Sequence, residues 1–163
     1  MKPEKNRLPI AGMFTAIIFI ATYLLQVPAF TGNINCGDGI ILYATLWLGY
    51  GAVLPAALGS ALSDILSGYV VYAPATLLIK ALMAVVSVLL LRAFGKHIAG
   101  RILAFCVAEI VMISGYFLFD TAFYGLGGAL LNVGSNSIQA VVAVLLGTLF
   151  SMAYNPLRGR TGR

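Results

Sequence analysis

The sequence sets a few ionisable side chains inside long apolar segments, and these are its best candidates for chemistry. The carboxylates of Asp38, Asp64, Glu109 and Asp120 and the amine of Lys80 each stand among apolar or small residues. Ionisable groups in apolar surroundings are costly unless they pair with one another or face water. Carboxylates and an amine held in this way could bind a polar solute, so the pattern indicates a binding site.

Amide and tyrosine side chains accompany these charges at helical intervals. Two helix faces carry polar residues three, four or seven positions apart: Glu109, Tyr116 and Asp120 on one, and Asn132, Asn136 and Gln139 on the other. Residues at such intervals share one face of a helix. Asn33 and Asn35 lie in a segment typical of a loop, Ala29–Gly37, as turn residues or as part of a ligand entrance.

The sequence gives little support to catalysis. It contains no paired-histidine metal motif, no nucleophile elbow and no acidic repeat for a metal-bound diphosphate. The glycine-rich run 124–128 is expected to be an outer loop, and it lacks the flanking strand and the lysine of a phosphate-binding loop. Two cysteines, Cys36 and Cys106, are too few for a zinc site. We therefore expect a protein that is not an enzyme and holds neither a cofactor nor a metal.

The composition is that of a membrane protein. Apolar residues make up 61% of the chain and charged residues 9%, whereas a soluble domain carries about 25% charged residues. The mean hydropathy is +0.98. The 163 residues leave room for several spans of about 20 residues and little else. We expect one integral membrane domain, residues 1–163.

The net charge of +5 comes from basic residues that form three clusters. The clusters are Lys2, Lys5 and Arg7 at the N-terminus, Arg92, Lys96 and Arg101 in one connecting segment, and Arg158, Arg160 and Arg163 at the C-terminus. Clusters of this kind are typical of cytoplasmic segments of membrane proteins. The placement therefore favours membrane topology over nucleic-acid binding.

Six spans are predicted, at about 8–27, 38–50, 51–67, 74–91, 102–122 and 129–154. The stretch 39–66 is either one long span or two short ones, and Gly49, Gly51 and Pro55 favour a turn in its middle. With two spans there, all three basic clusters fall on one side of the membrane. We expect an all-α, compact bundle of six transmembrane helices with cytoplasmic N- and C-termini.

This topology places most of the polar groups in the outer half of the bundle. Lys80 lies roughly 9 Å below the helix start at Pro74 by the rise of an α-helix, and only Glu109 lies deeper. One interpretation is a structural network with Lys80 paired to Asp64 or Glu109. We favour a solute pocket that opens outward, with Asp38 and Asp64 positioning loops above it, because the groups gather at one depth.

The first span carries small residues four positions apart, in the pairs Ala11/Thr15 and Gly12/Ala16. Small residues at this interval let another helix approach closely. The partner is either a helix of the same bundle or a separate membrane protein.

Several linked stretches resemble the substrate-binding S components of energy-coupling-factor (ECF) vitamin transporters. They are GDGIIL, then GYGAVLPAALGSALSDILSGYVVYAPATLLIK, then EIVMISGYFLFDTAFYG and NVGSNSIQ. The resemblance implies a multi-pass protein of the prokaryotic cell membrane that captures a vitamin or vitamin precursor from outside. It also implies partners: a transmembrane T component and two ATPase subunits.

The same resemblance implies roles for particular residues. The pocket of the family draws on the first outer loop and helices 4 to 6, which makes these residues substrate-binding candidates: Asn33, Asn35, Lys80, Glu109, Tyr116, Asp120, Asn132, Asn136 and Gln139. The family docks on its T component through paired alanines in helix 1. Here the matching positions are Ala11, Gly12, Thr15 and Ala16, which depart from the strict alanine pattern but stay small.

For the substrate, we rank a pyrimidine- or pyridine-type precursor slightly ahead of riboflavin, because amides, tyrosines and one lysine suit a small polar heteroaromatic ring. A different class of function is a self-sufficient carrier or channel that uses Glu109 and Lys80 as an ion relay. That protein would move solute without ATPase partners.

Overall fold

The computed structural model describes residues 7–29 and 33–160, and most of them are helical. The elements are α1 (Arg7–Leu24), β1 (Gln26–Pro28), β2 (Asn33–Asn35), α2 (Gly37–Leu48), the 3₁₀ turn η2 (Gly49–Ala52), α3 (Val53–Leu66), α4 (Ala73–Phe94) and α5 (Ile98–Arg160). α5 is not one straight helix. Gly125 has a left-handed φ of 72° and divides it into two arms, a conformation that glycine adopts without a steric penalty.

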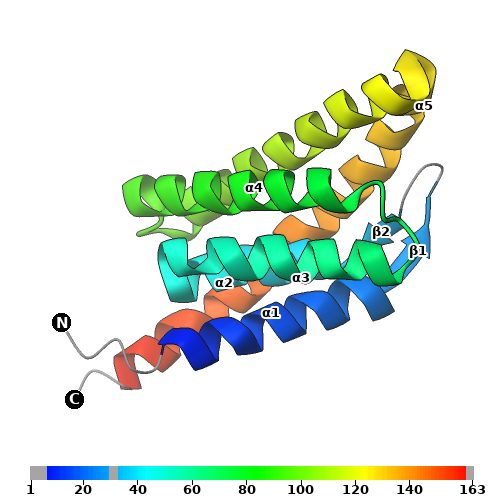
Figure 1. Cartoon of the computed structure of the whole chain (residues 1–163). Helices are drawn as coiled ribbons and strands as arrows, with labels where there is room; N and C mark the ends of the chain where they lie inside the picture. Colours follow the sequence, from blue (N-terminus) through cyan, green and yellow to red (C-terminus); the bar gives the residue numbers. More distant parts are fainter. Residues whose placement is uncertain (1–6, 30–32, 161–163) are drawn as a thin grey trace.

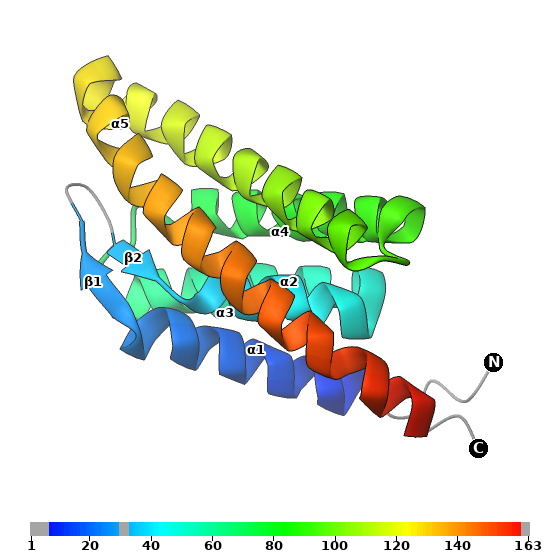
Figure 2. The same cartoon turned by 180° about the vertical axis from the view of Figure 1, so that it is seen from behind.

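The helices lie side by side and alternate in direction (Figure 1). The hairpin of β1 and β2, the 67–72 connection and the turn between the two arms of α5 lie at one end of the bundle, which we call the hairpin end. η2, the connection from α4 to α5, the start of α1 and the end of α5 lie at the other, the basic end. Figure 2 shows the second arm of α5 crossing the bundle from the hairpin end to the basic end.

The first connection is more ordered than the sequence indicates. α1 ends at Leu24, and Gln26–Pro28 pairs with Asn33–Asn35 as a two-stranded antiparallel sheet, with Val27 opposite Ile34. A helix through Val27 is therefore wrong, and so is a plain loop at Asn33–Asn35. Residues 30–32 of the expected loop lie outside the described residues. The strands are three residues long, too short to show a two-residue periodicity in the sequence.

The expected loop at 124–128 is also wrong, because the backbone stays helical on both sides of Gly125. The first arm of α5 begins at Ile98, earlier than expected. By length and composition, three helical stretches among the described residues could cross a membrane: Gly37–Leu66, Ala73–Phe94 and Ile98–Ala153. The first folds back at η2 and the third turns at Gly125, so each holds two helical segments. α1 is a shorter apolar helix.

The core lies between the helices and is mainly apolar. Its largest buried side chains come from different helices, as in Ile18 of α1, Leu42 of α2, Met83 of α4 and Phe105 of α5. Many large apolar side chains, by contrast, point outward, and Leu78 on α4 is 69% exposed. An extensive apolar exterior is expected of a surface that meets lipid.

Candidate functional site

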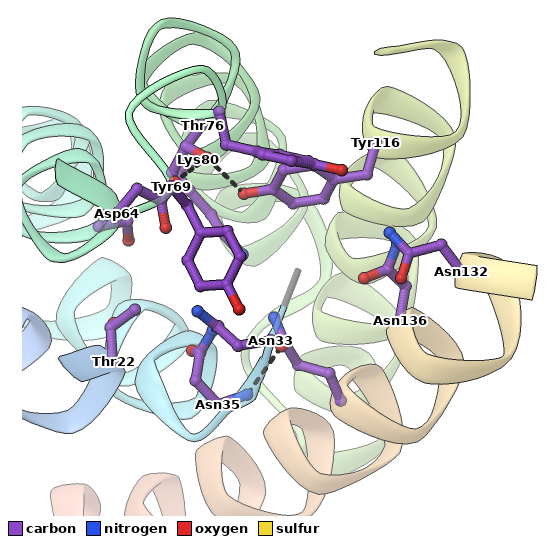
Figure 3. A pocket seen from close by; sticks show the side chains of 13 residues that line it. Thr22, Asn33, Asn35, Asp64, Tyr69, Thr76, Lys80, Tyr116, Asn132 and Asn136 are labelled. Carbon is purple, nitrogen blue, oxygen red and sulfur yellow. Dashed lines mark hydrogen bonds between the residues drawn. The ribbon is translucent and has the colours of Figure 1, made fainter. Parts of the chain in front are cut away.

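A polar cavity lies at the hairpin end, where α1, β2, α3, α4 and both arms of α5 converge (Figure 3). Amide, hydroxyl and charged side chains line it: Thr22, Asn33, Asn35, Ser60, Asp64, Tyr69, Tyr72, Thr76, Lys80, Tyr116, Asn132, Asn136 and Gln139. We call it the solute cavity. Its free volume is about 40 Å³. That volume holds about three waters at roughly 10–15 Å³ each, so little open space remains between these side chains.

A buried ion pair stands at its wall. Nζ of Lys80 donates to Oδ1 of Asp38 at 2.5 Å, and the two side chains are 3% and 1% exposed. Oδ2 of Asp38 accepts from Nε2 of Gln139 at 2.5 Å. The ring of Tyr116 adds a cation–π contact 5.4 Å from the amine. Charges buried in this way must be paired, so Lys80 is held by α2 and α5 and is not a free cation.

The same network reaches the hairpin. Oε1 of Gln139 accepts from the backbone N–H of Asn35 at 2.9 Å. The side chain of Asn35 accepts from the N–H of Gly37 at 3.0 Å and donates to Oδ1 of Asn33 at 3.1 Å. One amide, Gln139, therefore joins β2 to the Lys80–Asp38 pair and fixes the hairpin beside the cavity.

A second hydrogen-bond chain crosses from α5 to α3. The hydroxyl of Thr76 donates to Oδ2 of Asp64 at 2.5 Å and lies 2.9 Å from the hydroxyl of Tyr116. Because the proton of Thr76 goes to Asp64, Tyr116 is the donor to Thr76. This chain fixes the ring of Tyr116 and leaves the carboxylate of Asp64 on the cavity wall.

Asp120 lies behind the wall of the solute cavity and positions two side chains of that wall. It is fully buried and accepts from the hydroxyl of Tyr72 at 2.7 Å and from Nδ2 of Asn132 at 2.6 Å. These bonds tie the 67–72 connection to both arms of α5. Asp120 therefore orients groups that line the cavity and does not line it itself.

Aromatic rings form the flat part of the wall. Tyr72 packs on Tyr69, Tyr116 and Tyr124 with ring centroids 6.3, 6.4 and 6.3 Å apart. In Figure 3 the ring of Tyr69 projects into the middle of the cavity, toward Asn33 and Asn35. Aromatic faces beside amides suit a planar ligand with polar edges.

The comparison with known families decides the class of protein. A family model described as the S component of the ECF-type riboflavin transporter matches residues 4–156. This chain belongs to that family. The family consists of transporter subunits and is not a family of enzymes.

Two further likenesses accompany the family match. An uncharacterised protein of Pyrococcus woesei is 31% identical to this S component over 136 residues, which cover 80% of this chain and 88% of the relative. A solved structure described as the S component of a bacterial ECF transporter superposes with a TM-score of 0.68 at 20% identity. It covers 99% of this chain and 100% of its own. At that identity the superposition shows a shared fold.

The S component gathers most of the residues singled out from the sequence. Seven of the nine substrate-binding candidates line the solute cavity: Asn33, Asn35, Lys80, Tyr116, Asn132, Asn136 and Gln139. Asp120 is the eighth and lies behind the wall. Glu109, the ninth, is not among the residues that line the cavity. Their contact with a ligand stays a prediction.

Glu109 differs from every other buried carboxylate in the described part of the chain. It is 2% exposed, and neither of its oxygens has a hydrogen-bond partner among residues 7–29 and 33–160. The structure pairs Lys80 with Asp38, not with Glu109 or Asp64 as the structural interpretation of the sequence has it. Glu109 instead borders an apolar groove between the two arms of α5, with Ile113 and Val144.

Other cavity residues were missed by sequence reasoning, or given a different place. Thr22, Ser60, Tyr69 and Thr76 line the cavity without having been singled out, and Asp64 is on its wall and not only near a loop. Helical spacing carried a signal for some of them. Ser60 and Asp64 are four apart, as are Thr76 and Lys80, so each pair shares a face.

The two small-residue pairs of α1 face different surroundings. Gly12 and Ala16 are exposed, whereas Ala11 and Thr15 are half-buried, with the Thr15 hydroxyl donating to the carbonyl of Ala11 at 3.0 Å. α3 covers the Thr15 side so closely that a Cβ on Gly59 would come within 2.8 Å of the Thr15 carbonyl oxygen. Only the Gly12/Ala16 pair is therefore open to a partner.

Proposed function

We propose that this S component captures a planar heteroaromatic vitamin from outside the cell and delivers it with a T component and two ATPase subunits. Riboflavin is the first ligand to test, because the matching family model describes riboflavin transporters. A pyrimidine- or pyridine-type precursor is the alternative, and it now ranks second. The observation that carries the proposal is the solute cavity, where amides and tyrosine rings converge from both arms of α5 and the hairpin.

The charges around the cavity favour a neutral ligand. Asp38 neutralises Lys80 within a salt bridge, and Asp64 adds a carboxylate to the wall. An anionic ligand would have to compete with Asp38 for the amine, at the cost of leaving a buried carboxylate unpaired. A uracil-like ring edge, which offers both N–H and C=O groups, matches amide side chains without such competition.

The topology that the proposal needs is six membrane crossings with the basic end in the cytoplasm. The alternating helices and the two folded stretches, Gly37–Leu66 and Ile98–Ala153, support this count. The basic residues Arg92, Lys96 and Arg101 lie at or beside the connection of α4 to α5, away from the solute cavity. Positive-inside topology then puts the solute cavity on the outer side of a prokaryotic cell membrane.

Native mass spectrometry of the purified protein tests the proposal directly. We expect a bound vitamin-sized molecule, and tight binding of riboflavin by titration after it is removed. Asn136→Leu should weaken binding by about tenfold, because one or two hydrogen bonds to the ligand are lost. Leu145→Ala is the matched control, since this side chain lies on the same arm of α5 and is 65% exposed. Failure to bind any flavin, pyrimidine or pyridine compound would refute the proposal.

Transport in proteoliposomes separates this function from a self-sufficient carrier. The S component alone should bind the solute but not accumulate it inside the vesicles. Uptake should require the T component, the ATPases and ATP. Solute accumulation by the S component alone under a pH gradient would instead support an ion relay through Glu109 and Lys80.

A further inference from the structure

One face of α3 brings two incompletely bonded polar groups to the solute cavity. Ser60 and Asp64 are four residues apart, so they share a face of the helix, and both line the cavity. Their side chains are deeply buried, with 1% and 9% of the residue exposed. None of the nine substrate-binding candidates lies on α3, so this face adds a new part to the site.

Asp64 has one oxygen engaged and one that can still accept. Its Oδ2 accepts from the hydroxyl of Thr76. No hydrogen bond from the described residues reaches its Oδ1. Asp38 and Asp120, by contrast, accept on both oxygens. Asp64 is therefore a carboxylate on the cavity wall that is held in place through one oxygen and has the other available for a ligand.

The hydroxyl of Ser60 is buried and has no hydrogen-bond partner among the described residues. A hydroxyl side chain in a helix can donate to the carbonyl four residues before it, as Thr15 and Thr22 do on α1. Ser60 makes no such bond. Buried polar groups without partners are destabilising, so Ser60 and Asp64 would both gain from a ligand that supplies what they lack.

A hydroxyl group on the ligand supplies what both side chains lack. It has one donor and two acceptor lone pairs, so ligand hydroxyls can donate to Asp64 and accept from Ser60. An ammonium group has three donors and no acceptor, so it would leave the O–H of Ser60 unpaired. A ligand carboxylate would be repelled by Asp64. The pair therefore favours a neutral, hydroxylated group over a charged one.

This face of α3 is separate from the amides of α5. In Figure 3 Asp64 lies on one side of the Tyr69 ring, and Asn132 and Asn136 lie on the other. Amide side chains match a ring edge that offers both N–H and C=O groups, whereas a carboxylate only accepts. A ligand that spans the cavity would therefore place its heteroaromatic edge at α5 and its hydroxyls at α3.

We propose that Asp64 and Ser60 form a subsite for a hydroxylated arm of the ligand, opposite the amides that meet its ring. The inference deepens the proposed function and rests on it, because it names the part of the vitamin that α3 selects. It also gives Asp64 a direct contact with the ligand, where the sequence indicated only the positioning of a loop.

The test compares riboflavin with lumiflavin, which has the same ring system and a methyl group in place of the hydroxylated arm. Both are titrated into the full-length protein in detergent, for the wild type, Asp64→Asn, Ser60→Ala and Ser63→Ala. Ser63→Ala is the matched control. The Ser63 hydroxyl is also buried on α3 without a partner among the described residues, but it does not line the cavity.

We expect the wild type to bind riboflavin at least roughly tenfold more tightly than lumiflavin. Ser60→Ala should weaken riboflavin binding about fivefold and Asp64→Asn about tenfold, because hydrogen bonds to charged groups are the stronger ones. Lumiflavin affinity should change by less than about twofold in both variants, and Ser63→Ala should leave both flavins within about twofold. Thermal unfolding without ligand shows whether each variant is folded.

Several results would overturn the subsite while leaving the vitamin function intact. Equal losses for the two flavins in Asp64→Asn and Ser60→Ala would mean that α3 only shapes the cavity. Unchanged riboflavin affinity in both variants would mean that the arm lies elsewhere. Wild-type protein that binds the two flavins equally well would not recognise the arm at all.

The same comparison applies if the protein binds a pyridine compound and no flavin. Pyridoxine and a deoxypyridoxine that lacks one hydroxyl then replace the two flavins. Tighter binding of pyridoxamine than of pyridoxine, lost in Asp64→Asn, would overturn the hydroxyl assignment in favour of a cationic amine. If the wild type binds no flavin, pyrimidine or pyridine compound, the vitamin function itself fails, and the subsite fails with it.

Discussion

The amine of Lys80 and the carboxylate of Asp38 lie 2.5 Å apart, although their residues are 42 positions apart in the sequence. Gln139 bonds the same carboxylate and, through its oxygen, the backbone of Asn35. One ion pair thus joins α2, α4, the second arm of α5 and the hairpin. The buried ion pair and the attachment of the hairpin therefore depend on the same few bonds.

Asp38→Asn should destabilise the protein by about 3–5 kcal/mol, because it leaves the ammonium of Lys80 buried without its counter-charge. Equilibrium unfolding in one detergent measures the change. The double variant Asp38→Leu/Lys80→Met removes both charges and should recover most of the stability, since apolar replacements of a buried pair are often neutral or better. A single variant as stable as the wild type would show that water or another group compensates Lys80.

Glu109→Gln should leave the affinity for the vitamin within about twofold and the stability unchanged or higher. Neither carboxyl oxygen has a partner among the described residues, and a buried carboxylate without hydrogen bonds is destabilising. The residue also lies outside the wall of the solute cavity. Titration of the ligand and thermal unfolding of the same preparation measure both effects. A tenfold loss of affinity would place the Glu109 carboxyl in contact with the ligand after all.

Tyr69→Ala should speed association of the vitamin. The Tyr69 ring projects into a cavity of about 40 Å³, so a heteroaromatic ligand must displace it. If the ring leaves the cavity open in about a tenth of the molecules, removing it opens the cavity in nearly all of them. The association rate should then rise on the order of tenfold. Tyr69→Phe keeps the ring and should therefore associate more slowly than Tyr69→Ala. Stopped-flow binding distinguishes this from slower association, which would mean that the ring stacks on the ligand.

The sequence predicts cavity residues well where they all lie on one face of a single helix. Asn132, Asn136 and Gln139 recur on one face and all line the solute cavity, because α-helical geometry alone brings them together. The membrane class followed from composition in the same way. The position of Tyr69 carried no such signal, since it lies in a short connection between helices.

Features that depend on contact between distant segments were not readable in the sequence. Asp38 was assigned to loop positioning and Lys80 to other partners, because nothing in the spacing of residues shows that α2 and α4 pack together. The hairpin was not predicted for a related reason. Val27 and Ile34 pair on two neighbouring strands, and each strand is too short to have a pattern of its own. Gly125 appeared as part of a loop because glycine-rich runs usually are loops, whereas a single left-handed residue makes the turn here.

Ala16→Trp should prevent assembly with the T component and leave vitamin binding unchanged. Gly12 and Ala16 form the small-residue pair of α1 that is exposed in the described part of the chain. A bulky ring there would block the close approach that small residues permit. Co-purification with tagged T component and ATPases measures assembly, and titration measures binding. Leu78→Trp is the matched control, because Leu78 is 69% exposed on α4. Assembly retained by Ala16→Trp, or lost equally in Leu78→Trp, would show that docking uses another surface.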